Sequence, residues 1–448
     1  MALQTRTPPV AAAATLATAL ALACLPLQAQ VAGERPLRLD YRLGLGIEHS
    51  DNIRRTPAEP ISETVLLPNL AFALSGDGER FSVQAAGDAE FRDYRDGAFD
   101  SELRTRMGLS AAWRILPERL SWSFEDYLGR QPIDAFAIDR PDNQQRTNVL
   151  VTGPTLSLRP DPRTRVLAEL RYVDSWAQRT REFNSDRWNL ALRGLRQFST
   201  THAGSAHLEY SDTRFERTSA TVQSFERLDG FLRWDRRAAR TELSIDVGAS
   251  RIDFEDAESR DGSLLRLNAR WLPDEAQSVE LSAARQYSDA VADLIGAAPR
   301  LEDFELPVGL PSLRSTFLNP DVYRDTRFGI GHTRRGAGLF SRIDAYWRDQ
   351  DYARSDALDQ KVRGASLGLS RPLRETLSLN LYASIDRREY LLDAREDQDS
   401  LVGLALRWQW LRNLEVEVGA SRARRSSDLA SQAFEENRYF LGILYRRD

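Results

Sequence analysis

Hydrophobic and polar residues alternate strictly in the first structured part of this chain, from residue 37 onward. The apolar positions are Leu37, Leu39, Tyr41, Leu43, Leu45 and Ile47. The positions between them are Arg38, Asp40, Arg42, Gly44, Gly46 and Glu48. Because successive side chains of a strand point to opposite faces, this period predicts a β-strand with one apolar face and one polar face.

The same alternation recurs in short segments to the end of the chain, early examples being residues 64–74, 80–94 and 103–114. The pattern predicts about 20 strands, with about 18 as the alternative count. So many two-faced strands do not fit a sandwich of two sheets. They predict an all-β fold, a transmembrane antiparallel up-and-down β-barrel with lipid outside and water inside.

Short and long connections alternate between these segments. The short ones are rich in Pro, Gly, Asp and charged residues, as turns require; they are residues 75–79, 115–118, 159–162, 199–201, 236–239, 273–276, 334–337, 371–374 and 411–413. The longer ones include residues 50–63, 129–145, 177–184 and 288–321. Short periplasmic turns opposite longer extracellular loops are typical of outer-membrane barrels.

The overall composition agrees with a barrel and excludes a helical membrane protein. The 448 residues are 42% hydrophobic, and their mean hydropathy is −0.48. Beyond the N-terminus no run of about 18 apolar residues occurs, which a spanning helix would need. No shift in composition marks a second domain, so residues 30–448 are predicted to form one barrel.

Residues 1–29 have the parts of a secretory signal peptide: a basic Arg6, an apolar run at residues 10–25 and a small-residue cleavage site at residues 27–29. An acylated lipoprotein anchored through Cys24 is the alternative. Cys24 is the only cysteine, so cleavage after residue 29 leaves no disulfide and no thiolate metal site. We expect the outer membrane as the location, with its lipids and the barrel-assembly machinery as partners.

The nine tryptophans give an independent indication of the membrane boundaries. Six lie beside short turns, namely Trp113, Trp122, Trp234, Trp271, Trp408 and Trp410; three lie near the other strand ends, namely Trp176, Trp188 and Trp347. Two interfacial aromatic girdles would produce this placement. The alternative is that they are ordinary core aromatics at strand ends.

The polar face of the strands carries charges of both signs. The candidate lumen-facing residues are Arg38, Asp40, Arg42, Asp88, Glu90, Arg92, Arg104, Arg106, Arg114, Arg342, Asp344 and Arg348. One interpretation is a set of cross-strand salt bridges that stiffens a wide barrel. The other is a track of arginines whose planar guanidinium groups bind carboxylates or hydroxyls of a passing polymer.

The connection at residues 288–321 is the longest and contains four prolines among several apolar residues. Two interpretations stay open: the loop folds inward as a constriction, or it packs on itself at the surface.

No enzyme signature accompanies the barrel pattern. The four histidines, His49, His202, His207 and His332, are scattered and join neither a serine motif nor a metal-ligand pattern. Gly44-Leu45-Gly46 lacks the third glycine of a dinucleotide loop, and acids alternate with the arginines. We therefore expect no catalysis, no cofactor, no metal and no nucleic-acid partner.

Three segments carry a family resemblance: Ile47-Glu48-His49-Ser50-Asp51-Asn52-Ile53, residues 143–148 with the following Gly153-Pro154, and the closing stretch at residues 437–445. They resemble outer-membrane proteins of the β-barrel porin 2 type, which accompany exopolysaccharide biosynthesis clusters, including those linked to exosortase (PEP-CTERM) systems. The resemblance implies a conduit in export or surface organisation of an exopolysaccharide, with that polymer and its export apparatus as partners. It implies no catalytic residues.

Gly442 and Tyr445 stand at the spacing expected of a barrel-assembly signal, although three further residues follow Tyr445 in place of a terminal aromatic. Two other functions remain alternatives to export, a nutrient-uptake porin and a structural barrel. The few residues between the predicted cleavage site and the first strand argue against a plugged transporter.

Overall fold

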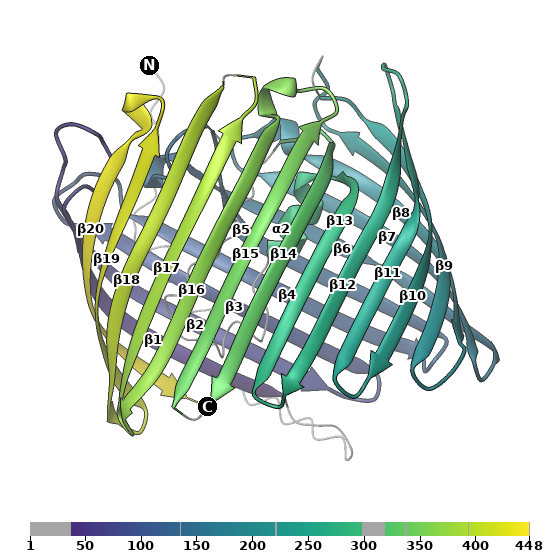
Figure 1. Cartoon of the computed structure of the whole chain (residues 1–448), viewed down its shortest axis with the longest axis horizontal. Helices are drawn as coiled ribbons and strands as arrows, with labels where there is room; N and C mark the ends of the chain where they lie inside the picture. Colours follow the sequence, from purple (N-terminus) through teal and green to yellow (C-terminus); the bar gives the residue numbers. More distant parts are fainter. Residues whose placement is uncertain are drawn as a thin grey trace.

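The computed structural model describes residues 37–134, 136–219, 222–297, 319–336, 338–392 and 394–447. They form a single closed barrel of 20 antiparallel strands (Figure 1). The predicted fold class and the predicted strand count are therefore confirmed. The predicted signal peptide at residues 1–29 lies outside the described residues.

The strands are 12 to 18 residues long. In chain order they are β1 (Arg38–Ser50), β2 (Glu63–Asp77), β3 (Phe81–Tyr94), β4 (Glu102–Leu116), β5 (Leu120–Pro132), β6 (Gln144–Asp161), β7 (Thr164–Ala177), β8 (Ser185–Gln197), β9 (His202–Phe215), β10 (Phe225–Ala238), β11 (Thr241–Phe254), β12 (Arg260–Asp274), β13 (Gln277–Ser288), β14 (Tyr323–Gly336), β15 (Leu339–Tyr352), β16 (Gln360–Arg374), β17 (Leu377–Tyr390), β18 (Arg395–Leu411), β19 (Leu414–Ser427) and β20 (Phe434–Arg447).

The extracellular connections contain the short helical elements: α2 (Ala290–Ala297) and the 3-10 turns η1 (Pro141–Asn143), η2 (Arg181–Phe183), η3 (Asp356–Leu358) and η4 (Ala430–Gln432). No helix among the described residues is long and apolar enough to cross a bilayer.

Each strand pairs with its sequence neighbours, and β1 pairs with β20 from Tyr41–Arg447 to Ser50–Arg438. This last pairing closes the barrel, so each of the 20 described strands has a partner on both edges. One position needs glycine. Gly153 has φ +155°, and a Cβ there would lie 2.0 Å from the carbonyl oxygen of Leu170. The Gly-Pro segment of the family resemblance therefore has a steric origin in the β6–β7 pair.

The predicted alternation places apolar side chains on the outside. On β1, Leu45 is 61% exposed and Ile47 is 41% exposed, while Glu48 lies on the opposite face. Eight of the nine tryptophans have exposed side chains; only Trp347 is half-buried. A continuous exposed apolar surface on a closed barrel is what lipid requires, because burial of that surface in the bilayer replaces burial in a core.

Candidate functional site: the lumen and its extracellular mouth

The inner wall is held by ion pairs between neighbouring strands. On β8, Arg193 bridges Glu169 of β7 and Glu209 of β9, at 3.0 and 3.1 Å. On β10, Arg233 makes two bonds of 2.7 Å to Asp246 of β11. These are cross-strand salt bridges of the kind in the first interpretation. Other predicted arginines pair along their own strand, as Arg104 does with Glu102 and Arg342 with Asp344.

The predicted lumen-facing residues divide into two groups. Those that line the central cavity are Arg42, Asp88, Glu90, Arg106, Arg342, Asp344 and Arg348. The others, Arg38, Asp40, Arg92, Arg104 and Arg114, are engaged in ion pairs outside the cavity lining. Arg92 for example is buried between Glu48 and Glu90. The structure therefore does not bring the candidates together into one continuous track.

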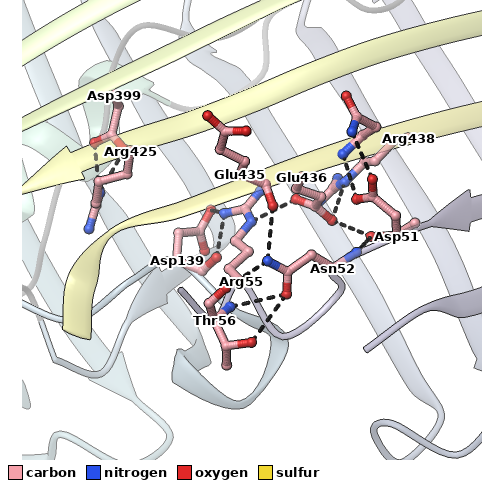
Figure 2. A network of polar contacts seen from close by, with 12 residues as sticks. Asp51, Asn52, Arg55, Thr56, Asp139, Asp399, Arg425, Glu435, Glu436 and Arg438 are labelled. Carbon is pink, nitrogen blue, oxygen red and sulfur yellow. Dashed lines mark hydrogen bonds and ion pairs between the residues drawn. The ribbon is translucent and has the colours of Figure 1, made fainter. Parts of the chain in front are cut away.

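A polar network at the extracellular end joins the first and last strands (Figure 2). The carboxylate of Glu436 on β20 is fully buried. It accepts hydrogen bonds from Ser50 at 2.7 Å and from Arg55 at 2.9 Å, and two more from Arg438. Asp51 accepts bonds from the backbone amide and the side-chain amide of Asn437. The Ser-Asp-Asn segment of the family resemblance thus closes the barrel.

The β5–β6 loop, residues 133–143, crosses the extracellular mouth. At Phe136 it contacts a distant part of the wall: Arg395 of β18 donates a hydrogen bond of 3.0 Å to the Phe136 carbonyl, and the Phe136 ring packs 5.2 Å from that of Tyr390 on β17. Arg55 donates to the Asp139 carbonyl, as Figure 2 shows. The loop therefore connects β5 and β6 with strands about a third of the barrel away.

The side chain of Asn143 organises this loop from inside. It accepts a bond of 2.9 Å from the Asp134 amide and donates bonds to the carbonyls of Asp134 and Ile138. Asn143 begins the second segment of the family resemblance. Two of the resembling segments thus shape the mouth, and the chain just after the first is joined to the chain just before the second where Arg55 contacts Asp139.

A second segment, α2 in the β13–β14 connection, lies inside the barrel (Figure 1). Its apolar side packs on the far inner wall. Ala290, Val291 and Leu294 form one buried cluster with the following residues of β6, β7 and η2: Val149, Val151, Val173, Ala177 and Phe183. The inward interpretation of the longest loop is confirmed for residues 288–297. Residues 298–318 of the loop lie outside the described residues.

Ion pairs fix α2 to two walls that are seven strands apart. Asp289 caps the helix by accepting the Ala292 amide at 2.9 Å, and it pairs with Arg187 of β8 at 2.8 Å. One turn on, Asp293 pairs with Arg348 of β15 at 2.9 Å. Burial opposes ionisation of Asp289, but Arg187 and the Ala292 amide hold its pKa below the ordinary value. The two ion pairs therefore hold α2 in place between two walls of the lumen.

Beside α2 the lumen encloses a cavity of 2280 Å³. It extends from the turn at Gly336 to the polar side of α2, where Ala292 and Asp293 line it. Small residues such as Gly329 and Ser366 on its wall leave the space open. Arginines and carboxylates both line it, so the cavity offers many hydrogen-bonding groups with charges of both signs.

Sequence reasoning missed the residues that hold these two segments: Asp289, Asp293, Phe136, Arg395 and Glu436. Their contacts join segments far apart in the chain, and alternation gives no indication of such pairs. One signal was present. On β6 and β7 the inward residues Val149, Val151 and Val173 are apolar, whereas inward residues elsewhere are mostly polar. They form the surface on which α2 packs.

The histidines are scattered, as the sequence predicts. His49 is hydrogen-bonded to Thr64, His207 to Ser205 and His332 to Gln277. The His202 ring stacks on that of Trp234. Within the described part of the chain, no group of three or more His, Cys, Asp or Glu side chains is arranged to hold a metal ion.

Closure, outward apolar faces and a polar lumen together define a transmembrane β-barrel of the outer-membrane type. No model of a known protein family matches the chain, and no curated protein matches its sequence. Among solved structures, the siderophore receptor PirA of Pseudomonas aeruginosa is 14% identical, with a TM-score of 0.43, over 92% of this chain and 80% of that one.

Two other barrels are similar to the same degree. The ferric enterobactin receptor PfeA of Pseudomonas aeruginosa, in complex with enterobactin, is 11% identical, with a TM-score of 0.47, over 93% of this chain and 82% of that one. The FrpB iron transporter of Neisseria meningitidis is 9% identical, with a TM-score of 0.45, over 91% and 81%. At such identities the likeness concerns the barrel architecture alone.

Proposed function

We propose that this barrel is a passage for small polar solutes across the outer membrane, with α2 as its constriction. The observation that carries the proposal is the fixing of α2 between β8 and β15 by Arg187–Asp289 and Arg348–Asp293. A helix whose first turn is fixed to two walls of a wide barrel narrows the lumen and limits the size of what passes. This is the uptake-porin alternative of the sequence analysis.

The lining of the cavity supports a polar solute. The inner arginines are largely matched by carboxylates, for example Arg342 by Asp344 at 2.8 Å. Such a wall presents hydrogen-bond donors and acceptors without a strong field of one sign, which suits polar solutes of low charge better than one class of ion.

Export of a surface polysaccharide, which the family resemblance implies, stays a second proposal. A polymer chain would have to pass both α2 and the β5–β6 loop, so export requires that these segments move. Secreted polysaccharide from a deletion strain, compared with a complemented strain, tests this function. Loss of surface polymer would favour export, and normal secretion would leave the solute passage.

Single-channel conductance in a planar bilayer tests the constriction. In Asp289→Asn/Asp293→Asn the amide side chain introduced at the first position can still cap α2, but both ion pairs are lost. We expect a rise in conductance on the order of twofold, because α2 is no longer held across the lumen.

The matched control is Asp212→Asn/Asp253→Asn, which removes two carboxylates paired with Arg214 and Arg251 on the outer face. It should conduct like the wild type. Equal conductance of the two folded double variants would contradict a constriction by α2, and a silent wild type would favour the structural barrel.

A further inference from the structure

The outer surface at the periplasmic ends of β16 and β18 gathers guanidinium and indole groups. Arg371 and Arg374 end β16, Trp408 and Trp410 end β18, and Arg412 follows in the next turn; these five residues are here named the Arg–Trp patch. The indole rings are stacked with centroids 6.2 Å apart and are 47% and 55% exposed. These ends of β16 and β18 are at the lower end of the barrel in Figure 1.

Strand register places the patch on the lipid-facing side. Arg374 is opposite Leu377 of β17, and Leu377 is opposite Trp408. Leu373 and Leu411 beside it are 48% and 59% exposed. The patch therefore begins where the apolar outer surface ends, which is the depth of lipid headgroups.

The three arginines of the patch have no acidic partner. Within the described residues, no carboxylate oxygen lies within 4.0 Å of the guanidinium nitrogens of Arg371, Arg374 or Arg412. Glu375 follows Arg374 but is not paired with it at that distance, and Glu415 is directed to Arg407.

The same sector of the barrel is different at its extracellular end. There three outward arginines are paired across strands: Arg363 with Glu389, Arg387 with Glu396, and Arg422 with Glu435. The unpaired guanidinium groups are thus concentrated at one membrane boundary of these strands. A guanidinium without a carboxylate partner keeps its donors available for the two oxygens of a phosphate.

We propose that the Arg–Trp patch binds the phosphate headgroup of an anionic phospholipid in the periplasmic leaflet. The guanidinium groups would hold the phosphate, and the indoles and leucines would contact the glycerol and upper acyl chains. A lipid, in contrast to a soluble anion, accounts for both halves of the patch, because its apolar side chains lie on the same outward surface as the arginines.

Lipid retention measures this binding. The full-length barrel is reconstituted in vesicles of phosphatidylcholine and phosphatidylglycerol in equal amounts, extracted in mild detergent, and its bound lipids are quantified. We expect the wild type to retain phosphatidylglycerol preferentially, with a preference that falls as salt rises. In Arg371→Gln/Arg374→Gln/Arg412→Gln the preference should fall on the order of tenfold.

The control, Arg363→Gln/Arg387→Gln/Arg422→Gln, removes three outward arginines from the extracellular end and should retain the wild-type preference. Heat-modifiable gel mobility checks that both variants fold. If the patch variant does not fold, Arg371→Lys/Arg374→Lys/Arg412→Lys takes its place; it keeps the charge, loses the planar fork, and should give an intermediate preference.

Three results would overturn the proposal: no preference in the wild type, the same loss in both glutamine variants, or no change in the lysine variant. Inorganic phosphate at the same phosphate concentration is added as a competitor. If it displaces phosphatidylglycerol completely, the patch is a bare anion site and the lipid assignment is wrong.

Discussion

Glu436 shows what one buried carboxylate does at the barrel closure. Its side chain is fully buried and accepts bonds from Ser50, Arg55 and Arg438. In Glu436→Gln the partly buried guanidinium groups of Arg55 and Arg438 lose this buried counter-charge, and such a loss costs about 3 kcal/mol. We expect the free energy of unfolding to fall by that amount, measured by urea titration of heat-modifiable gel mobility.

The neighbouring carboxylate gives a matched control. Glu435 is half exposed on the outer face and pairs with Arg422 at 2.7 Å. An exposed pair contributes at most about 1 kcal/mol, so Glu435→Gln should change stability little. A similar loss in both variants would mean that the closure does not depend on the buried network.

Asp321, in the connection before β14, is a buried carboxyl with a titration of its own. Burial raises its pKa from 3.8 to about 6, against the opposing effect of amides such as that of Arg354, which donates to it at 2.8 Å. Because the folded-state pKa is raised, the protonated form favours the folded loop. This stabilisation is complete below the ordinary pKa and is lost as pH rises through about 6.

Hydrogen exchange at the amides of Val322 and Arg354 tests this titration. After correction for intrinsic rates, protection in the wild type should fall between pH 4 and pH 7 by up to on the order of 100-fold. In Asp321→Asn protection should not change with pH, whereas the exposed Asp356→Asn should behave like the wild type. A flat wild-type profile would show that Asp321 does not control the loop.

At the scale of elements, β20 combines closure with the predicted assembly signal. Tyr445 points outward, is 38% exposed and lies 6.5 Å from Tyr41 across the closing pair, while a Cβ on Gly442 would meet the Phe440 ring at 2.6 Å. We predict that Tyr445→Ala lowers the amount of folded protein in the outer membrane severalfold, because the recessed signal loses its aromatic.

Tyr439→Ala is the control, since it removes another outward aromatic of the same strand, one that is 57% exposed. Refolding of purified Tyr445→Ala into detergent should be normal, which separates recognition by the assembly machinery from folding. Unchanged levels in cells would remove Gly442 and Tyr445 as the signal.

The strands themselves follow from sequence more directly than their connections do. A slip of one residue would turn every apolar side chain of a strand into the lumen, so lipid and water together enforce the period that the sequence shows. Some strands end later than the alternation predicts. For example, β2 ends at Asp77, whereas residue 74 is the predicted end, because backbone pairing continues past the last apolar position into the turn. The inward course of α2 depends on contacts with Val173 and Arg348, and no local pattern encodes those partners.

At the scale of the whole molecule, the lumen is crossed twice on its extracellular side, by α2 and by the β5–β6 loop. The crossings differ in chemistry. Asp289 and Asp293 hold α2 through ion pairs, whereas the β5–β6 loop reaches β17 and β18 by the Phe136 ring and carbonyl. The loop is also held at Asp139 by Arg55. At Phe136, however, its hold on β17 and β18 is a ring contact and one hydrogen bond, which are weaker than two charge pairs, so this part of the loop is expected to move first when solute passes.

Reversible cross-linking tests whether that movement is needed. In a Cys24→Ser background the chain has no other cysteine, so Phe136→Cys/Tyr390→Cys can be joined by a short reducible bis-thiol reagent. The two side chains face each other with ring centroids 5.2 Å apart. We expect solute flux into liposomes to fall severalfold on cross-linking and to recover on reduction.

The control pair, Tyr172→Cys/Trp188→Cys, has nearly the same ring separation, 5.1 Å, but joins the adjacent strands β7 and β8 on the outer face. Cross-linking there leaves the mouth free and should not change flux. If the Phe136–Tyr390 cross-link also leaves flux unchanged, solutes pass beside a fixed β5–β6 loop. The size limit of the passage would then be set by α2 alone. Loss of the two ion pairs of α2 would widen the passage, whereas release of the Phe136–Tyr390 cross-link would not.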